Sequence, residues 1–408
     1  MKHLLFFLIT FVTQCSHSPS RAPASEESHG EAVAEENFRA FGTLKGEVQQ
    51  SLKAIYAKSP DTGIGFHRLN SPEVPAAVRK VAKSVFKIRI PEDSADNFFD
   101  VKVKKNDLKA AAEEICKKVT ALDDFDRAVL KAQLQRCKEQ QSDKKNYTCT
   151  VRPLTTQFTG FLAGNGRTLV VNAHAFDGRY PHGDKYAEIK NGRNPASDLP
   201  IYIFNESGQQ VLGQKDGAVL VRGYGGNDNV KGGSPAPLDS DWASLLLPKN
   251  IGQPLRFAGQ PAHEGDKVFL FGYPAQTGNA TTKTLSKMKD FSSGITRGGG
   301  LDSDGKHLFV SRGRLIPDSQ AISAVDLPKG ENGVKPDQML FYTADSAGGN
   351  SGGPVVNARG EVLGIHAGGR GFVLNGDFEI PQPNSPADRH LYRISRGVRA
   401  DVFKNFVN

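Results

Sequence analysis

The chain has 408 residues, of which 38% are hydrophobic and 43 are glycine. This supplies enough apolar sequence for a large core with appendages, and the glycine content argues against a helical bundle. The formal net charge of +8, from 52 basic and 44 acidic residues, is small for this length, so the composition gives no reason to expect nucleic acid binding.

The N-terminus predicts export. The apolar run from Leu4 to Val12 follows a lysine and is too short to span a bilayer as a stable helix, so residues 1–24 are interpreted as a signal peptide. The sequence is compatible with two sites at which the signal peptide is processed. The sequence ending at Cys15 resembles a bacterial lipobox, in which Cys15 is acylated, whereas the Ala-Pro-Ala that ends at Ala24 offers ordinary cleavage. The expected location is the periplasm, the outer membrane as a lipoprotein, or the medium, with membrane contact only through this lipid anchor.

Residues 25–71 are expected to form a tether and a helix. The stretch 16–35 is rich in Ser, Ala, Glu and Pro and is predicted to be disordered. Apolar residues then recur at steps of three or four, which predicts an amphipathic helix over 36–57. This helix is either a removable propeptide or an arm packed on the folded domain, and the sequence leaves both open.

The folded domain is expected to begin near Pro72, because VAKSVFKIRI at 81–90 is typical of a β-strand. The next stretch that is typical of a strand in this domain begins only at Phe158. It follows an insertion at about 92–150 that has a helical pattern. The insertion is interpreted as a helical hairpin whose many lysines form a solvated face. Asp107 caps the first predicted helix, which carries Leu108, Ala112, Ile115 and Val119, and Asp123 or Asp124 caps the second, which carries Val129, Leu130, Leu134 and Cys137.

Three cysteines, Cys116, Cys137 and Cys149, lie in or beside this insertion. In an exported protein such clustering predicts one disulfide and one remaining thiol. In an ideal antiparallel hairpin Cys116 lies near the turn and Cys137 far from it, an offset on the order of 15 Å that exceeds the ~7 Å Cα limit for a disulfide. Cys149 is therefore the expected member of the pair, although crossed helices would allow the other choice. The spacing of Cys and His predicts no metal site.

Two segments further along place a histidine and a carboxylate at strand ends. Residues 160–176 read GFLAGNGRTLVVNAHAF, an apolar strand, a glycine turn and a second strand that ends just before His174. Residues 239–247 read DSDWASLLL, which puts Asp241 at the start of a buried strand, with Asp239 as the alternative carboxylate. Trp242 beside it is interpreted as a packing residue.

Residues 343–369, TADSAGGNSGGPVVNARGEVLGIHAGG, set Ser351 in a glycine-rich turn before a short apolar strand. The glycines let the backbone turn sharply, so that the hydroxyl is exposed and the amides of Gly349 and Ser351 can point at one spot. A serine needs a base and an orienting carboxylate to act as a nucleophile. The order His174, Asp241, Ser351 is one in which such a triad occurs.

The strings LVVNAHAF, SDWASLLL, GDKVFLFGYP (265–274) and GNSGGPVVNARGEVLGI follow one another in this chain. With them the sequence resembles the trypsin-like serine endopeptidases of the chymotrypsin fold, in their bacterial glutamyl-endopeptidase and HtrA-like branches, over roughly residues 72–400. The resemblance implies a mostly β protease domain over 72–408. Its expected architecture is two six-stranded antiparallel β-barrels, with the N-terminal helix and the helical hairpin added.

The resemblance also implies the roles of the site residues. His174 is the general base, Asp241 orients it, Ser351 attacks, and Gly349 with Ser351 forms the oxyanion hole. The digestive proteases carry an Asp directly before the serine, which binds a newly cut amino terminus, but this chain has Asn350. We therefore expect a site that does not depend on such a cut.

Four residues are candidates for the specificity pocket. Asp345 matches the pocket-floor acid of trypsin, and His366 matches the histidine by which glutamyl endopeptidases hold an acidic side chain. Ser346 fits either scheme, and Gly368 is the fourth candidate. Because a buried carboxylate attracts Lys and Arg, cleavage after basic residues is expected. The alternatives are a preference for acidic residues, and a small pocket shaped by Asp345 paired with His366.

The sequence therefore predicts an exported serine endopeptidase that acts on proteins or peptides through an acyl-enzyme, without a cofactor or metal. Two alternatives stay open: an HtrA-like quality-control enzyme or glutamyl endopeptidase, and a non-catalytic surface binding protein on a protease scaffold. The oligomeric state is not predicted.

Overall fold

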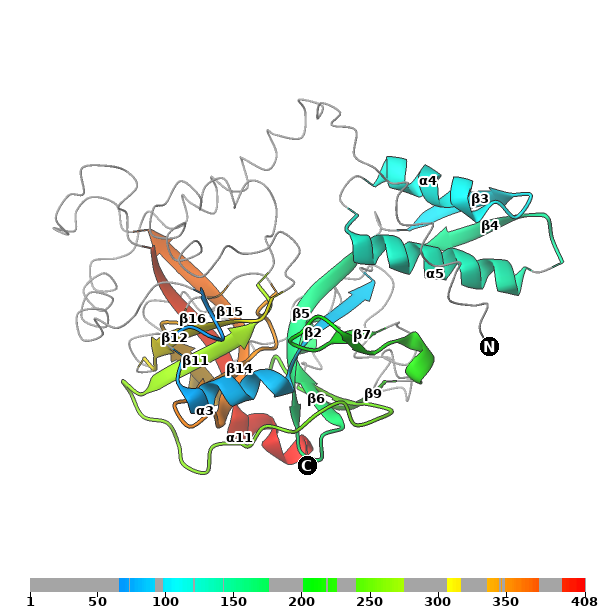
Figure 1. Cartoon of the computed structure of the whole chain (residues 1–408). Coiled ribbons are helices and arrows are strands. Elements are labelled where there is room, and N and C mark those ends of the chain that lie inside the picture. The colour runs from blue at the N-terminus through cyan, green and yellow to red at the C-terminus, as the bar shows by residue number, and fades with distance from the viewer. Residues whose placement is uncertain are drawn as a thin grey trace, which may run out of the picture. The chain divides into compact units, whose positions relative to one another are not determined.

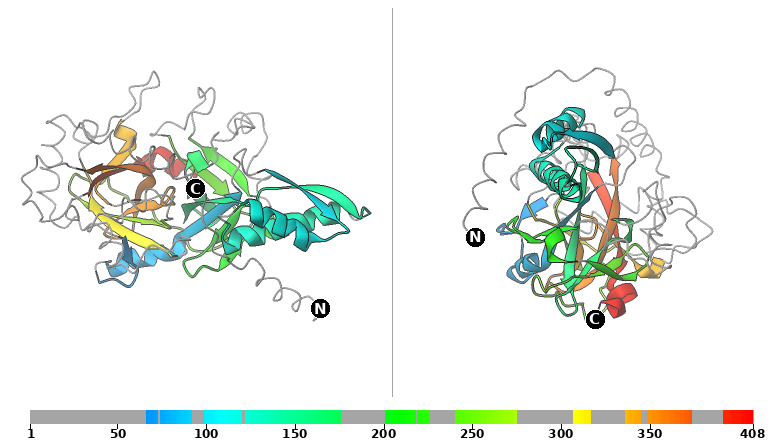
Figure 2. Two further views of the ribbon diagram at one scale, coloured as in Figure 1. Left: turned by 90° about the horizontal axis from the view of Figure 1, so that it is seen from above. Right: turned by 90° about the vertical axis from the view of Figure 1, so that its right-hand side faces the viewer.

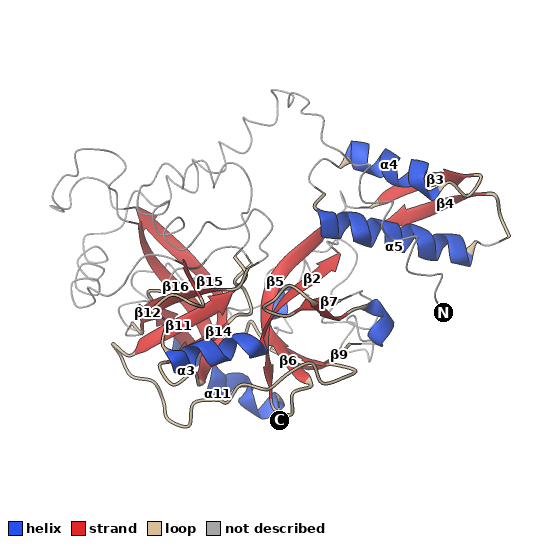
Figure 3. Cartoon of the chain, viewed as in Figure 1, coloured by secondary structure: helices blue, strands red, loops and turns tan. Residues whose placement is uncertain are grey.

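A computed structural model of the protein describes residues 66–72, 74–91, 98–119, 122–141, 143–175, 201–217, 219–225, 240–274, 307–316, 336–344, 346, 349–373 and 391–407. The predicted signal peptide, tether and first helix lie outside these ranges. The chain divides into two compact units. The larger comprises Val33–Ile90 and Thr156–Asn408, and the smaller includes Pro91–Thr155. The larger unit is mostly β, as the strands in Figure 3 show.

The first sheet of the larger unit has seven strands in the order β8-β7-β2-β5-β6-β10-β9. Its pairs β2–β7, β7–β8, β5–β6, β6–β10 and β9–β10 are antiparallel. The strands are β2 (Val85–Pro91), β5 (Thr155–Ala163), β6 (Thr168–Val171), β7 (Tyr202–Phe204), β8 (Gln210–Leu212), β9 (Leu220–Tyr224) and β10 (Ala243–Leu246). A 3-10 turn, η4 (Gln214–Asp216), lies between β8 and β9.

The expected glycine turn joins β5 to β6. Gly164 and Gly166 have φ angles of 58° and 79°, in the left-handed region that glycine adopts without a steric penalty. The Asn165 side chain accepts a hydrogen bond from the Arg167 N–H at 3.0 Å. Strand, turn and strand therefore form as the sequence predicts.

The second sheet also has seven strands, in the order β1-β12-β11-β14-β15-β16-β13. Its strands are β1 (Phe66–Arg68), β11 (Lys267–Gly272), β12 (Phe309–Arg314), β13 (Met339–Tyr342), β14 (Pro354–Asn357), β15 (Val362–Val373) and β16 (Leu391–Arg399). A 3-10 turn, η5 (Pro336–Gln338), precedes β13. Both sheets twist and curl (Figure 2).

In the described parts of the chain each sheet has seven strands, one more than the six we expected. One reason is β1, which pairs with β12 and places Phe66 opposite Ser311. The segment that contains β1 falls within the predicted tether and helix at 25–71, because three residues are too short to give a strand pattern in the sequence. The mostly β, two-sheet architecture is as expected.

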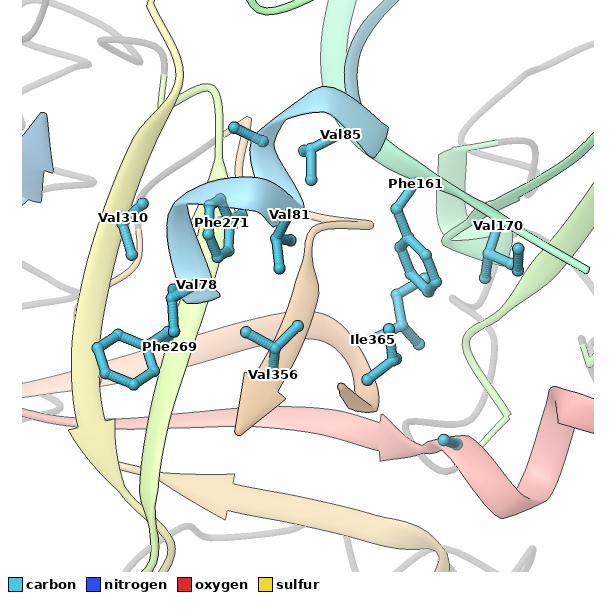
Figure 4. Packing of buried hydrophobic residues seen from close by; sticks show 14 of the residues in the cluster. Val78, Val81, Val85, Phe161, Val170, Phe269, Phe271, Val310, Val356 and Ile365 are labelled. Carbon is cyan, nitrogen blue, oxygen red and sulfur yellow. The ribbon is translucent and has the colours of Figure 1, made fainter. Parts of the chain in front are cut away.

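One apolar core joins the two sheets of the larger unit. β5 and β6 contribute Phe161 and Val170, and the second sheet contributes Phe271, Val356 and Ile365. All five side chains are fully buried. Figure 4 shows these side chains together with Val78, Val81 and Val85. Burying one such side chain stabilises the fold by roughly 1.5–3 kcal/mol. This shared core fixes the loops of the two sheets relative to each other.

Short helices close the core. α3 (Ala76–Arg79) and η1 (Lys80–Ser84) precede β2, and α11 (Ala400–Phe403) and η7 (Lys404–Phe406) follow β16 (Figure 1). Trp242 is 4% exposed, and its ring centroid lies 5.9 Å from that of Phe403 and 5.1 Å from that of Phe406. Trp242 is thus a packing residue, as expected.

The smaller unit contains the two predicted helices and a strand pair. α4 (Leu108–Lys118) begins after Asp107, whose side chain accepts from the Ala110 N–H at 3.0 Å. α5 (Asp124–Gln140) begins after Asp123, which forms a capping box with Asp126. The insertion is more than the expected hairpin, because β3 (Phe99–Lys104) and β4 (Asn146–Val151) pair as an antiparallel ribbon.

The ribbon and the helices share a core of their own. Val101, Val103 and Val151 of the ribbon are buried against Ile115 of α4 and Leu134 of α5. Alternate residues of β3 point to opposite faces, so that Lys102 and Lys104 are exposed. The lysines therefore form a solvated face, as the sequence indicated.

A disulfide joins Cys137 of α5 to Cys149 of β4, with their Cα atoms 5.9 Å apart. Cys149 is thus a member of the pair, as predicted, and Cys116 is a half-buried thiol on α4. In the described parts of both units, no helix has the length and apolar character needed to cross a membrane.

Candidate active site

His174 stands in a 3-10 turn directly after a buried strand. All four residues of β6 are buried, and η3 (Ala173–Ala175) follows them with His174 half-buried. The ring Nδ1 lies 2.7 Å from Asp241 Oδ2, and the main-chain N–H of His174 donates to Asp241 Oδ1 at 2.9 Å. Since an ionised carboxylate only accepts, Nδ1 carries the proton and Nε2 keeps its lone pair. This tautomer can act as a general base.

Asp241 lies just before β10 and is 4% exposed. β10 pairs with β6 and places Ala243 opposite Val171, which brings the start of one strand to the end of the other. The buried amide of Asn172 donates to the main-chain carbonyl of Asp241 at 2.8 Å. The carboxylate and the backbone that carries it are thus both fixed against the strand that ends at His174.

Ser351 stands in the turn before β14. Gly349 and Gly352 on either side have φ angles of 93° and 86°, a conformation that other residues adopt only with strain. The Gly353 N–H donates to the Asn350 carbonyl at 2.9 Å, which closes the turn. Ser351 is half-buried in this tightly constrained turn.

The serine turn abuts the strands that lead to His174. The Thr159 N–H of β5 donates to the Ser351 carbonyl at 2.8 Å. A β-carbon placed on Gly352 would overlap the Thr159 carbonyl oxygen and lie 3.4 Å from the Asn172 nitrogen. Asn172 is two residues before His174, so the serine turn lies against the chain segment that leads to the histidine.

Comparison with known protein families identifies one match. The sequence profile of the trypsin-like peptidase domain matches residues 158–365, just over half of the chain. The chain belongs to the trypsin-like peptidase family. It is therefore a serine endopeptidase, as the sequence predicted. No curated protein sequence matches the chain.

Several solved structures are similar to this protease. The active form of the Rv3671c protease from M. tuberculosis is 16% identical with a TM-score of 0.35, and the match covers 82% of this chain and 83% of that one. A serine endoprotease from Yersinia pestis is 14% identical with a TM-score of 0.36, and the match covers 81% of this chain and 65% of that one. The closeness to glutamyl endopeptidases and HtrA-like proteases stays a prediction.

The pocket candidates of the protease lie on β15 and in the segment after β13. His366 is 1% exposed, and its Nδ1 lies 2.5 Å from the hydroxyl of Tyr342. Burial raises the pKa of Tyr342 well above its usual value, so the phenol stays protonated at neutral pH. Ser346 is buried, and its hydroxyl lies 3.2 Å from that of Ser395, which donates to the Ala344 carbonyl at 2.7 Å. These contacts give the protease a set of buried polar groups at one place in the second sheet.

Gly368 follows on β15, and a β-carbon on it would lie 3.8 Å from Nε of Arg396. Asp345, the expected acid of the pocket floor, lies outside the described residues, and so does Asp239. The predicted pairing of Asp345 with His366 is therefore not described. The carboxylate in contact with His174 is that of Asp241.

Sequence reasoning missed three residues around the site of the protease: Asn172, Thr159 and Tyr342. Asn172 has a weak local signal, because it stands between a buried strand and the histidine. Thr159 and Tyr342 have none, because each lies within a strand and its contacts are with residues far along the chain. For Thr159 the separation from Gly349 is 190 residues.

Proposed function

We propose that this serine endopeptidase is exported and cleaves peptide bonds through an acyl-enzyme, with His174 as general base, Asp241 as its orienting group and Ser351 as nucleophile. The observation that carries the proposal is the two-point contact between Asp241 and His174, at 2.7 and 2.9 Å. That contact leaves Nε2 as the basic nitrogen of the imidazole.

The reaction begins with the loss of the Ser351 proton to His174 Nε2 while Oγ attacks the carbonyl carbon of the substrate. The negative charge that forms on the carbonyl oxygen is stabilised by the N–H groups of Gly349 and Ser351. The tetrahedral intermediate then collapses, the C–N bond breaks, and His174 gives its proton to the leaving amine. Water, deprotonated by His174, hydrolyses the acyl-enzyme and restores the serine.

Labelling with a fluorophosphonate probe tests this proposal. The purified protein should take up one probe molecule, and both Ser351→Ala and His174→Ala should abolish rapid labelling. Ser207→Ala is a matched control, since Ser207 is exposed in the turn between β7 and β8, and it should label like wild type. A wild-type protein that does not label would instead favour a binding protein on a protease scaffold.

Cleavage after Lys or Arg is our proposal for the substrate preference, and it depends on the charge of Asp345 in the pocket. A preference for acidic side chains is a second candidate, and the Tyr342–His366 contact favours it. If the Tyr342 hydroxyl donates to Nδ1, the proton of His366 lies on Nε2, which can then donate to a carboxylate. Peptides that differ only in Arg, Lys, Glu or Ala before the cleaved bond separate the two, and a preference for Glu would reject the first.

Export rests on the sequence of residues 1–24. Fractionation of a bacterium that expresses the full chain should place the protein outside the cytoplasm, and replacing residues 4–12 with polar residues should retain it inside. Labelling with a fatty acid, compared between wild type and Cys15→Ala, distinguishes a lipid anchor from ordinary signal cleavage.

A further inference from the structure

Thr159 of β5 is tied to the serine turn through both its main chain and its side chain. Its N–H donates to the Ser351 carbonyl at 2.8 Å, and its hydroxyl donates to the Gly349 carbonyl at 2.6 Å. The same hydroxyl accepts from the Tyr273 N–H at 3.1 Å, just after β11. Thr159 is 0% exposed. One residue of the first sheet thus contacts two elements of the second.

The directions of these hydrogen bonds follow from the groups involved. The Tyr273 main-chain nitrogen can only donate, so the Thr159 oxygen must accept from it. The Gly349 carbonyl can only accept, so the Thr159 hydroxyl must donate to it. The hydroxyl proton therefore has one orientation, and a side chain without a hydroxyl would leave a buried N–H and a buried carbonyl without this partner.

The contacts fix the backbone between the two expected oxyanion donors. The Gly349 carbonyl belongs to the peptide group that follows the Gly349 N–H, and the Ser351 carbonyl belongs to the one that follows the Ser351 N–H. The peptide group between them is held by the bond from the Gly353 N–H to the Asn350 carbonyl at 2.9 Å. The Gly352 N–H also donates to the His366 carbonyl at 2.9 Å. Rotation of either peptide group held by Thr159 would turn a neighbouring oxyanion donor away.

We propose that Thr159 is a positioning residue for catalysis: its hydroxyl holds the Gly349 carbonyl so that the amides of Gly349 and Ser351 face the same point. The inference rests on the proposed function, in which these amides stabilise the oxyanion. It assigns to the first sheet, which carries His174, a direct part in shaping the oxyanion hole of the second.

Two substitutions separate this role from simple packing. Thr159→Val keeps the shape of the side chain and removes the hydroxyl, whereas Thr159→Ser keeps the hydroxyl and removes a methyl group. Both retain the main-chain bond to Ser351. If the valine variant does not fold, Thr159→Cys replaces it in the same measurements, because a thiol is only a weak donor. A packing role predicts that Thr159→Ser, which loses a methyl group, lowers activity more than the isosteric Thr159→Val. A positioning role predicts the reverse: Thr159→Ser retains activity and Thr159→Val loses it.

The first measurement uses the full-length protein and its best substrate from the peptide panel. In Thr159→Val we expect kcat per labelled serine to fall about 10- to 100-fold with little change in KM, because a displaced oxyanion donor acts mainly on the transition state. Binding of a peptide aldehyde, which forms a negatively charged adduct with the serine, should weaken by the same factor. Thr159→Ser should stay within about threefold of wild type in kcat. Wild-type kcat and aldehyde affinity in the valine variant would overturn the proposal.

A second measurement does not depend on activity. Hydrogen exchange of a peptide covering 349–353 reports on the Gly352 and Gly353 amides, while a peptide covering 354–365 reports on the neighbouring strands. Thr159→Val should speed exchange of the first peptide relative to the second, and Thr159→Ser should not. If wild type neither labels nor cleaves, the proposed function fails. If the 349–353 peptide exchanges equally fast in Thr159→Val and in wild type, the positioning role of Thr159 is rejected.

Discussion

Replacing Asp241 with asparagine changes the protonation of His174 without changing the shape of the site. In the structure one carboxylate oxygen accepts from the His174 main-chain N–H at 2.9 Å and the other faces Nδ1 at 2.7 Å. A main-chain N–H can only donate, so the single oxygen of an asparagine must face it. The asparagine NH₂ then faces Nδ1, which has to accept, and the imidazole proton moves to Nε2.

With its proton on Nε2, His174 cannot take the proton of Ser351. A triad in the wrong tautomer loses about 10⁴-fold in kcat, which corresponds to about 5 kcal/mol of transition-state stabilisation at ~1.36 kcal/mol per tenfold. The assay is kcat on the best peptide of the panel, with circular dichroism to verify folding. Asp266→Asn, at an exposed turn carboxylate that accepts from the His263 N–H, is the matched control and should keep wild-type kcat. A fall of less than tenfold in Asp241→Asn would refute the tautomer argument.

Three further predictions concern other parts of the chain. Cys137→Ser removes the bond to Cys149, which closes a separation of 12 residues, and should lower the stability of the smaller unit by about 3 kcal/mol in thermal unfolding, an effect that a reductant should reproduce in wild type. Gly352→Ala forces a side chain into the left-handed region and against the Thr159 carbonyl, so soluble yield and labelling should both collapse; normal labelling would show that the turn is differently built. Burial raises the pKa of Tyr342, so the folded protein retains a proton that the unfolded chain loses above about pH 10, and stability should fall as pH rises beyond that point; Tyr342→Phe should flatten this fall in urea titrations at pH 8 to 11, and an unchanged slope would contradict it.

The sequence predicted most of what is local in the fold. The turn at Gly164 and Gly166, the strand that leads to His174 and the caps at Asp107 and Asp123 each depend on residues close together in the chain, and they form as expected. The β3–β4 ribbon was not predicted, although FDVKVK alternates in polarity, because its lysines suggested only a solvated face. The alternation of FDVKVK is the period-2 pattern of a strand with one buried face.

The residues that support the site could not be predicted from the sequence, for a different reason. The contact between Asn172 and Asp241 spans 69 residues, and that between Thr159 and Gly349 spans 190. In each pair, the sequence around one residue has no composition or spacing that identifies the other residue as its partner. Such pairs become visible only when the strand order places the end of β6 beside β10 and the serine turn beside β5.

The most direct test of the account is a crystal structure of the protein after reaction with a peptidyl phosphonate. The account predicts a phosphorus atom bonded to Ser351 Oγ, with one phosphonyl oxygen about 2.7–3.1 Å from the main-chain nitrogens of Gly349 and Ser351. His174 should remain bonded to Asp241 through Nδ1 and face the adduct with Nε2. A phosphonate on another residue, or an adduct on Ser351 whose oxygen points away from both amides, would contradict it.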